Sequence, residues 1–216
     1  MNIYNEDTLQ AKGIKYLKGK YGDDVVFSVN QVYKEPQQYN MYITVEGQED
    51  WDVRLTWNFD EESFKDNYMS WVFQEEIEQT FYEIFLQVYK ECKLYNSPYG
   101  GQELNIYTKD TTLDEYLQTA LGSDISLFIL GTPENSDQET EKVQQLFIEK
   151  NWNIHLYIYY VSQNVYDQLK QESLKEDANR LLYAPFQKQY YLRGSFLLDN
   201  KKIEMGSWIE GKTQQP

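Results

Sequence analysis

Alternation of apolar and polar residues predicts three strands in the first third of the chain. The alternating runs lie at 24–33, 40–45 and 50–59, and each places its apolar side chains on one face of a sheet. Residues 46–50, which read EGQED, are typical of a hairpin turn between the second and third runs. We therefore expect an antiparallel sheet with one strongly apolar face, and that face needs a cover.

Helical spacing of apolar residues predicts helices on both sides of these strands. The first spans 7–21 and stops at Gly22, as a helix commonly does at a glycine. Because the glycines of this segment follow a helix and precede a strand, their order is the reverse of a phosphate-binding loop. A second, long helix begins near Tyr68 and is expected to cover the sheet. Its apolar positions are Phe73, Ile77, Phe81, Ile84, Phe85, Val88 and Cys92.

After residue 98 the pattern changes to strands that alternate with helices. This order predicts parallel strands joined by right-handed crossovers, with 125–130 and 153–161 as neighbours. A short helix and then a hairpin that turns at Asp199 and Asn200 complete the chain. The expected segments are a strand at 103–108, a helix at 111–122, a strand at 124–131, a helix at 136–150, a strand at 151–161, a short helix at 165–174 and a hairpin at 190–210.

Together these patterns predict an α+β fold in two parts. Residues 1–98 are expected to form an N-terminal helix and an antiparallel sheet covered by a long helix. Residues 99–216 are expected to form a βαβαβ (α/β) part followed by a C-terminal β-hairpin. The boundary is placed at the turn-rich stretch YNSPYGGQ.

Composition narrows the range of partners. The 216 residues include 35 acidic and 20 basic side chains, which give a formal net charge of −15. Most of such a surface repels nucleic acid and anionic membranes. The acidity either serves solubility alone or forms a negative face that steers a basic protein partner. Cys92 is the only cysteine, which excludes an internal disulfide and a cysteine-type zinc site. No apolar run is long enough for a transmembrane helix.

Four segments carry a family resemblance: KYLKGKYGDDVVFSV, FKDNYMSWVFQEEIE, LDEYLQTALGSDISLFILG and NWNIHLYIYYV. Together they resemble a set of uncharacterised exported or lipid-anchored proteins of Gram-positive Firmicutes, over residues 9–205. The resemblance implies a location at the cell envelope and no known activity. The chain departs from this pattern by lacking a leader with an acylated cysteine. The location is therefore expected to be the envelope if a leader has been removed, and the cytoplasm otherwise.

The sequence offers little for catalysis. His155 is the only histidine, and we interpret it as a strand residue packed among tyrosines, while Cys92 lies at an apolar helix position. Motifs for metal, nucleotide or dinucleotide binding are absent from the sequence, so we predict no enzyme activity and no cofactor. The enzyme alternative is a carboxylate-using hydrolase, which would require a cleft lined by Trp51, Trp57 or Trp71 with two facing carboxylates.

The remaining hypothesis is recognition of another protein. The chain holds 20 tyrosines, and tyrosine provides a large, rigid contact surface with a polar tip. We expect a non-enzymatic, acidic protein-binding module exposed at the bacterial cell envelope, with an immunity-type inhibitor of a basic toxin as the alternative. The candidate contact residues are Tyr157, Tyr159, Tyr190 and Tyr191, and the oligomeric state is left open.

Overall fold

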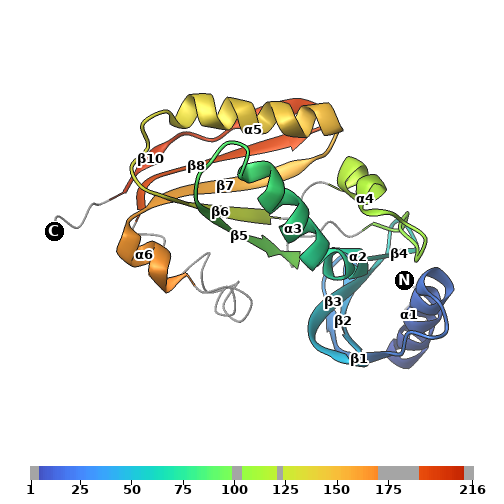
Figure 1. Cartoon of the computed structure of the whole chain (residues 1–216). Coiled ribbons are helices and arrows are strands. Elements are labelled where there is room, and N and C mark those ends of the chain that lie inside the picture. Colours follow the sequence, from blue (N-terminus) through green and yellow to red (C-terminus); the bar gives the residue numbers. More distant parts are fainter. Residues whose placement is uncertain (1–4, 99–103, 121–123, 170–189, 212–216) are drawn as a thin grey trace. The chain divides into compact units, whose positions relative to one another are not determined.

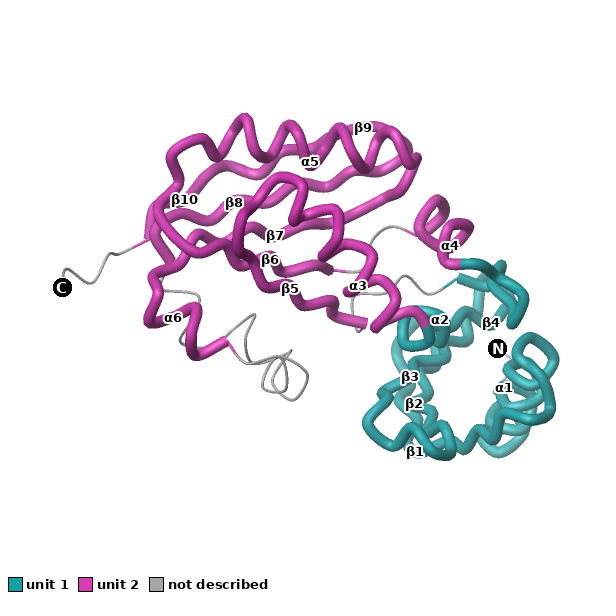
Figure 2. The backbone as a smooth tube through the Cα atoms, in the orientation of Figure 1, with its two compact units in different colours: residues 1–72, 102–112 teal, residues 73–101, 113–216 magenta. Residues whose placement is uncertain are grey.

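The fold is α+β and divides into two compact units (Figures 1 and 2). The computed structural model describes residues 5–98, 104–120, 124–169 and 190–211. The first unit comprises residues 1–72 and 102–112, and the second comprises 73–101 and 113–216. The predicted boundary after residue 98 therefore differs from this division, because residues 73–98 pack with the second unit and residues 104–112 return to the first.

The first unit contains a four-stranded antiparallel sheet in sequence order, and its first three strands are those that the alternation predicted. Its helix α1 ends at Gly22, whose φ of 106° favours glycine, as the sequence also predicted. The strand β4 was not predicted, because a four-residue strand carries too short a pattern. The elements are α1 (Glu6–Tyr21), β1 (Phe27–Lys34), β2 (Gln38–Val45), β3 (Gln48–Asn58), β4 (Ser63–Asp66) and α2 (Tyr68–Val72).

Helix α1 covers the apolar face of this sheet. Leu9 and Leu17 are buried on the helix, and Met41 and Leu55 are buried on the strands beneath. Gly13 makes the close approach possible, since a Cβ atom added there would lie 2.7 Å from Leu55 Cδ2. The helix predicted to provide the cover instead belongs largely to the second unit, where it packs on a different strand.

The second unit contains a six-stranded mixed sheet in the order β10-β8-β7-β6-β5, with β9 paired to β8. The strands β6 and β7 are parallel neighbours, which confirms the predicted pairing of 125–130 with 153–161. The elements are α3 (Gln74–Phe85), β5 (Cys92–Ser97), α4 (Leu113–Thr119), β6 (Asp124–Leu130), α5 (Ser136–Lys150), β7 (Ile154–Val161), α6 (Gln163–Gln168), β8 (Tyr190–Asp199), β9 (Lys202–Met205) and β10 (Ile209–Glu210).

Two details of the predicted elements were wrong, one in each part of the chain. Within 103–108, the described residues form only an isolated bridge between Leu104 and Asp66, so the parallel part is reduced to β6-α5-β7. The long helix ends at Phe85, and Cys92 begins the strand β5, which pairs antiparallel with β6. Short apolar runs fit helix and strand equally well, and only the pairing partner decides between them.

Side chains from helices pack against both faces of the six-stranded sheet. On one face, Tyr160 of β7 donates a hydrogen bond of 2.6 Å to Glu139 of α5, and the rings of Phe81 on α3 and Phe147 on α5 lie 4.8 Å apart. On the opposite face, Tyr159 packs with Val165 of α6. The hairpin of β8 and β9 turns at Asn200 and the residue after it, one position later than predicted. The predicted ends of two helices, at 122 and 174, lie outside the described residues.

Candidate functional site

The four tyrosines proposed as contact residues differ in their exposure. Tyr159 retains only 6% of its surface, because it stacks on Phe128 at a ring distance of 5.1 Å and packs with residues of α6. Tyr157 and Tyr190 are half-buried against the same cluster, and Tyr191 is also half-buried. Burial therefore removes Tyr159 from any direct contact, while the other three keep part of their surface in solvent.

His155 is held on the same face of the sheet by a carboxylate. Its Nδ1 atom lies 2.8 Å from Asp124 Oδ1, and its ring lies 4.5 Å from that of Tyr157. The parallel register of β6 and β7 places Asp124 directly beside His155. The sequence could not identify this pairing, because it depends on which strands are neighbours and on their register.

A larger feature of the second unit is an acidic pocket of about 740 Å³ between α3, β5 and α6. A cavity of this volume is within the range of sites that bind small molecules or single side chains. Its walls combine four carboxylates and two tyrosines with one ammonium group. The lining residues are Glu75, Glu78, Gln79, Tyr82, Glu91, Cys92, Lys93, Leu94, Tyr166 and Asp167. We refer to this site as the acidic pocket.

One face of α3 builds the first wall of the acidic pocket. Glu75, Glu78 and Tyr82 recur at three and four residues, a spacing that aligns side chains along one side of a helix. The adjoining side of α3 carries Phe81 and other apolar residues into the core. Glu78 is only 8% exposed, and its carboxylate accepts a hydrogen bond of 3.2 Å from the backbone N–H of Asn96. This bond fixes the helix wall to β5.

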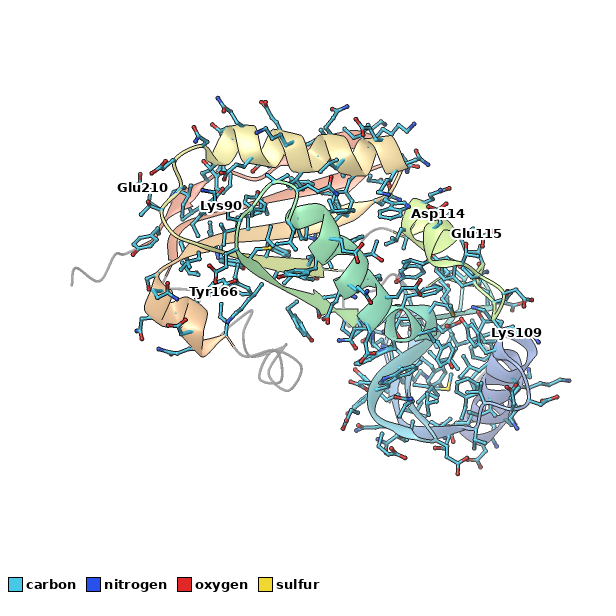
Figure 3. All side chains as sticks on the ribbon, in the orientation of Figure 1. Lys90, Lys109, Asp114, Glu115, Tyr166 and Glu210 are labelled. Carbon is cyan, nitrogen blue, oxygen red and sulfur yellow. The ribbon has the colours of Figure 1, made fainter. Side chains whose placement is uncertain are left out.

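Lys93 fixes the wall formed by α6. Its ammonium group donates hydrogen bonds to the carbonyl oxygens of Tyr166 and Leu169, at 2.7 and 2.8 Å. The same group lies 4.3 Å from the centre of the Tyr166 ring, which Figure 3 labels on α6. A cation over an aromatic face is stabilised by the ring's negative quadrupole. The positive charge of Lys93 is thus engaged with backbone carbonyls and a ring, and Glu91 and Asp167 remain exposed at the pocket.

The thiol in the acidic pocket is poorly suited to nucleophilic chemistry. Cys92 is buried, and burial raises the pKa of its thiol to about 11. Because the thiolate is the reactive form, such a group is inert at neutral pH. Burial, followed by the charges of Glu91 and Cys92, also raises the pKa of Tyr166. The lining therefore presents carboxylates and offers no activated nucleophile from this cysteine.

A smaller hollow of about 170 Å³ lies on the first unit, beside Trp51. It is the feature closest to the cleft that the hydrolase hypothesis requires. Its carboxylates are Glu49, Asp50 and Asp52, which follow one another on β3 and do not come from opposite walls. Burial raises the pKa of Asp52, and the charge of Arg54 opposes this shift. The other two candidate tryptophans, at positions 57 and 71, are buried in the core.

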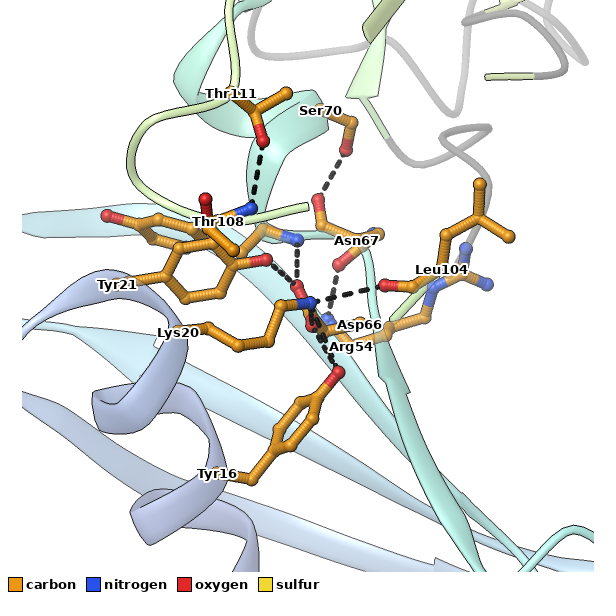
Figure 4. A network of polar contacts seen from close by, with 11 residues as sticks. Tyr16, Lys20, Tyr21, Arg54, Asp66, Asn67, Ser70, Leu104, Thr108 and Thr111 are labelled. Carbon is orange, nitrogen blue, oxygen red and sulfur yellow. Dashed lines mark hydrogen bonds and ion pairs between the residues drawn. The ribbon is translucent and has the colours of Figure 1, made fainter. Parts of the chain in front are cut away.

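A buried polar cluster in the first unit surrounds Asp66 (Figure 4). One carboxylate oxygen accepts hydrogen bonds from Lys20 at 2.6 Å and Tyr16 at 3.2 Å. The other accepts from the Tyr21 hydroxyl at 2.6 Å and the Tyr68 backbone N–H at 3.1 Å. Burial lowers the pKa of Lys20, and the charge of Asp66 partly opposes this shift. Because four donors satisfy the carboxylate, we assign the cluster a structural role that joins α1 to β4.

Comparison with protein-family models, with curated proteins and with solved structures found no match for this chain. The resemblance to exported or lipid-anchored proteins therefore stays a prediction. Among the described residues, no group of three or more histidine, cysteine, aspartate or glutamate side chains is arranged to hold a metal ion. No helix in the described parts of the chain is long and apolar enough to cross a membrane.

Proposed function

We propose that the protein is a non-enzymatic, acidic protein-binding module whose acidic pocket receives a basic side chain of its partner. The observation that carries this proposal is the pocket itself: four carboxylates and two tyrosines line about 740 Å³, and the one ammonium group there is already engaged. A lysine or arginine side chain would find opposite charge and aromatic walls in the same cavity.

The overall charge supports the same proposal. With a formal net charge of −15, the protein attracts a basic partner over distances longer than a contact. Such steering raises the rate of association, whereas the pocket would supply the specific contact. The location at the cell envelope remains a prediction that rests on the family resemblance alone.

The alternative function is inhibition of a basic toxin, as in an immunity-type protein. The acidic pocket favours it, because an inhibitor needs only to bind and cover a positively charged active site. The two functions differ in what the partner does. An inhibitor abolishes a measurable activity of its purified partner, whereas an envelope module leaves the partner active.

The test compares two double variants, each of which removes two negative charges. Glu91→Gln with Asp167→Asn alters the acidic pocket, and Glu76→Gln with Glu83→Gln alters exposed residues of α3 outside its lining. Immobilised protein is used at low salt to capture partners from an extract of the source organism, and affinities are then measured with the purified partner. We expect the pocket variant to bind at least about tenfold more weakly than the control, because hydrogen bonds to charged groups are lost.

Two results would contradict the proposal. One is equal affinity of the pocket variant and the control variant for the captured partner, which would place the contact elsewhere. The other is failure of the wild-type protein to capture any partner at low salt, where charge-driven contacts are strongest. Circular dichroism of each variant confirms that the substitutions leave the fold intact.

A further inference from the structure

The strand β9 forms an open edge of the six-stranded sheet. Among the described strands it pairs only with β8, and all four of its residues are exposed. Ile203 and Met205 keep 40% and 51% of their surface in solvent, although both are large apolar residues. An open edge with apolar side chains is a template for pairing with another strand.

The pairing with β8 determines which backbone groups of β9 point outward. The N–H of Gly206 donates a hydrogen bond of 2.8 Å to the carbonyl of Ser195, so this pair is hydrogen-bonded. Bonded and non-bonded pairs alternate along an antiparallel ladder. Glu204 therefore directs its backbone groups toward β8, and Ile203 and Met205 direct their N–H and C=O groups away from it.

The charged residues on either side of Ile203 can pair with those of a second copy of the chain. In an antiparallel pair of two β9 strands centred on Ile203, Lys202 of each copy lies opposite Glu204 of the other. A pair centred on Glu204 would instead place two glutamates opposite each other, which is unfavourable. Only the first register matches both the outward backbone groups of Ile203 and the charges.

We propose that the protein forms a twofold-symmetric dimer through β9, with Ile203 of one copy opposite Ile203 of the second copy. The backbone groups of Ile203 would exchange two hydrogen bonds, and the two isoleucine side chains would lie side by side and leave water. The symmetry is isologous, because the same four residues form both halves of the contact. This proposal rests on the sheet edge alone and is independent of the acidic pocket.

Analytical ultracentrifugation over a concentration series tests the dimer, at about 0.15 M salt so that the net charge of each copy is screened. The average mass of the wild-type protein should rise from 25.9 kDa toward twice that value. Lys202→Glu and Glu204→Lys should each weaken the dimer by about tenfold, because two opposite-charge pairs become like-charge pairs. Lys15→Glu on α1 makes the same charge change as the first variant and should leave the dimer unchanged.

The decisive measurement mixes the two charge-reversed variants. A mixed dimer restores opposite charges at both positions, so an equimolar mixture should associate more tightly than either variant alone. Circular dichroism checks that both variants are folded. A wild-type protein that stays at 25.9 kDa at every concentration overturns the proposal, as does a dimer that both charge reversals leave unchanged.

Discussion

At the scale of single residues, Asp66 shows how a buried charge is stabilised in this protein. Its carboxylate is inaccessible to solvent and receives hydrogen bonds from a lysine, two tyrosine hydroxyls and one backbone N–H. A buried ion pair contributes little compared with an apolar replacement, but the loss of one partner leaves the other charge buried and unpaired. The cluster therefore makes the first unit sensitive to substitution at this position.

We predict that Asp66→Ala lowers the free energy of unfolding by about 3–5 kcal/mol, because Lys20 loses its buried counter-ion. Tyr21→Phe removes one hydrogen bond to the same carboxylate and should cost about 1.5–3 kcal/mol. Urea denaturation followed by circular dichroism measures both effects.

The control for Asp66 is the exposed ion pair between Glu61 and Lys65. Solvent screens this pair, so Glu61→Ala should leave the urea midpoint close to that of the wild-type protein. Equal midpoints for the Asp66 and Glu61 variants would contradict a stabilising role for the buried cluster.

At the scale of elements, the turn between β8 and β9 has a backbone conformation to which only one of its two residues is suited. Asn200 and Lys201 both have positive φ, at 48° and 64°. Asparagine tolerates this region, whereas lysine has a Cβ atom that crowds the backbone there. Two-residue turns of this kind favour asparagine followed by glycine. Lysine at position 201 is thus less favourable for this turn than glycine would be.

We predict that Lys201→Gly raises the stability of the hairpin by about 0.5–1 kcal/mol, since relief of backbone strain outweighs the added freedom of the unfolded chain. Thermal unfolding measures the change. The matched control is Asn200→Gly, which should gain less, because asparagine already accepts its conformation and its side chain bonds to Asp199. A larger gain at Asn200 than at Lys201 would show that strain at the second turn position is not limiting.

At the scale of the whole molecule, buried tyrosines link stability to pH in both units. Burial raises the pKa of each of these side chains, to about 12 for Tyr159, and that of Cys92 to about 11. A group whose pKa is higher in the folded state stabilises that state fully below its unfolded pKa and loses this effect as the pH rises through the folded value. The tyrosines with raised pKa are Tyr16, Tyr21, Tyr68, Tyr89, Tyr159, Tyr160 and Tyr166.

We therefore predict that stability is constant up to about pH 9 and falls steeply above about pH 10, where unfolded tyrosines ionise. The ultraviolet absorbance of tyrosinate and the far-ultraviolet circular dichroism should change together above pH 10, since these side chains ionise on unfolding. Complete ionisation of the tyrosines near pH 10 with the circular dichroism unchanged would contradict the prediction.

Local pattern by itself determined the helix that ends at Gly22, the alternating strands of the first sheet, the parallel pair β6 and β7, and the C-terminal hairpin. These features depend on side-chain periodicity and turn residues, which are properties of neighbouring positions in the sequence. The tertiary structure alone decided that Cys92 lies in a strand, because β6 provides its partner. It also decided the position of the acidic pocket, because Glu78 comes from α3, Glu91 from the bend before β5 and Asp167 from α6. Contacts between such distant segments depend on packing and strand register, which periodicity does not encode.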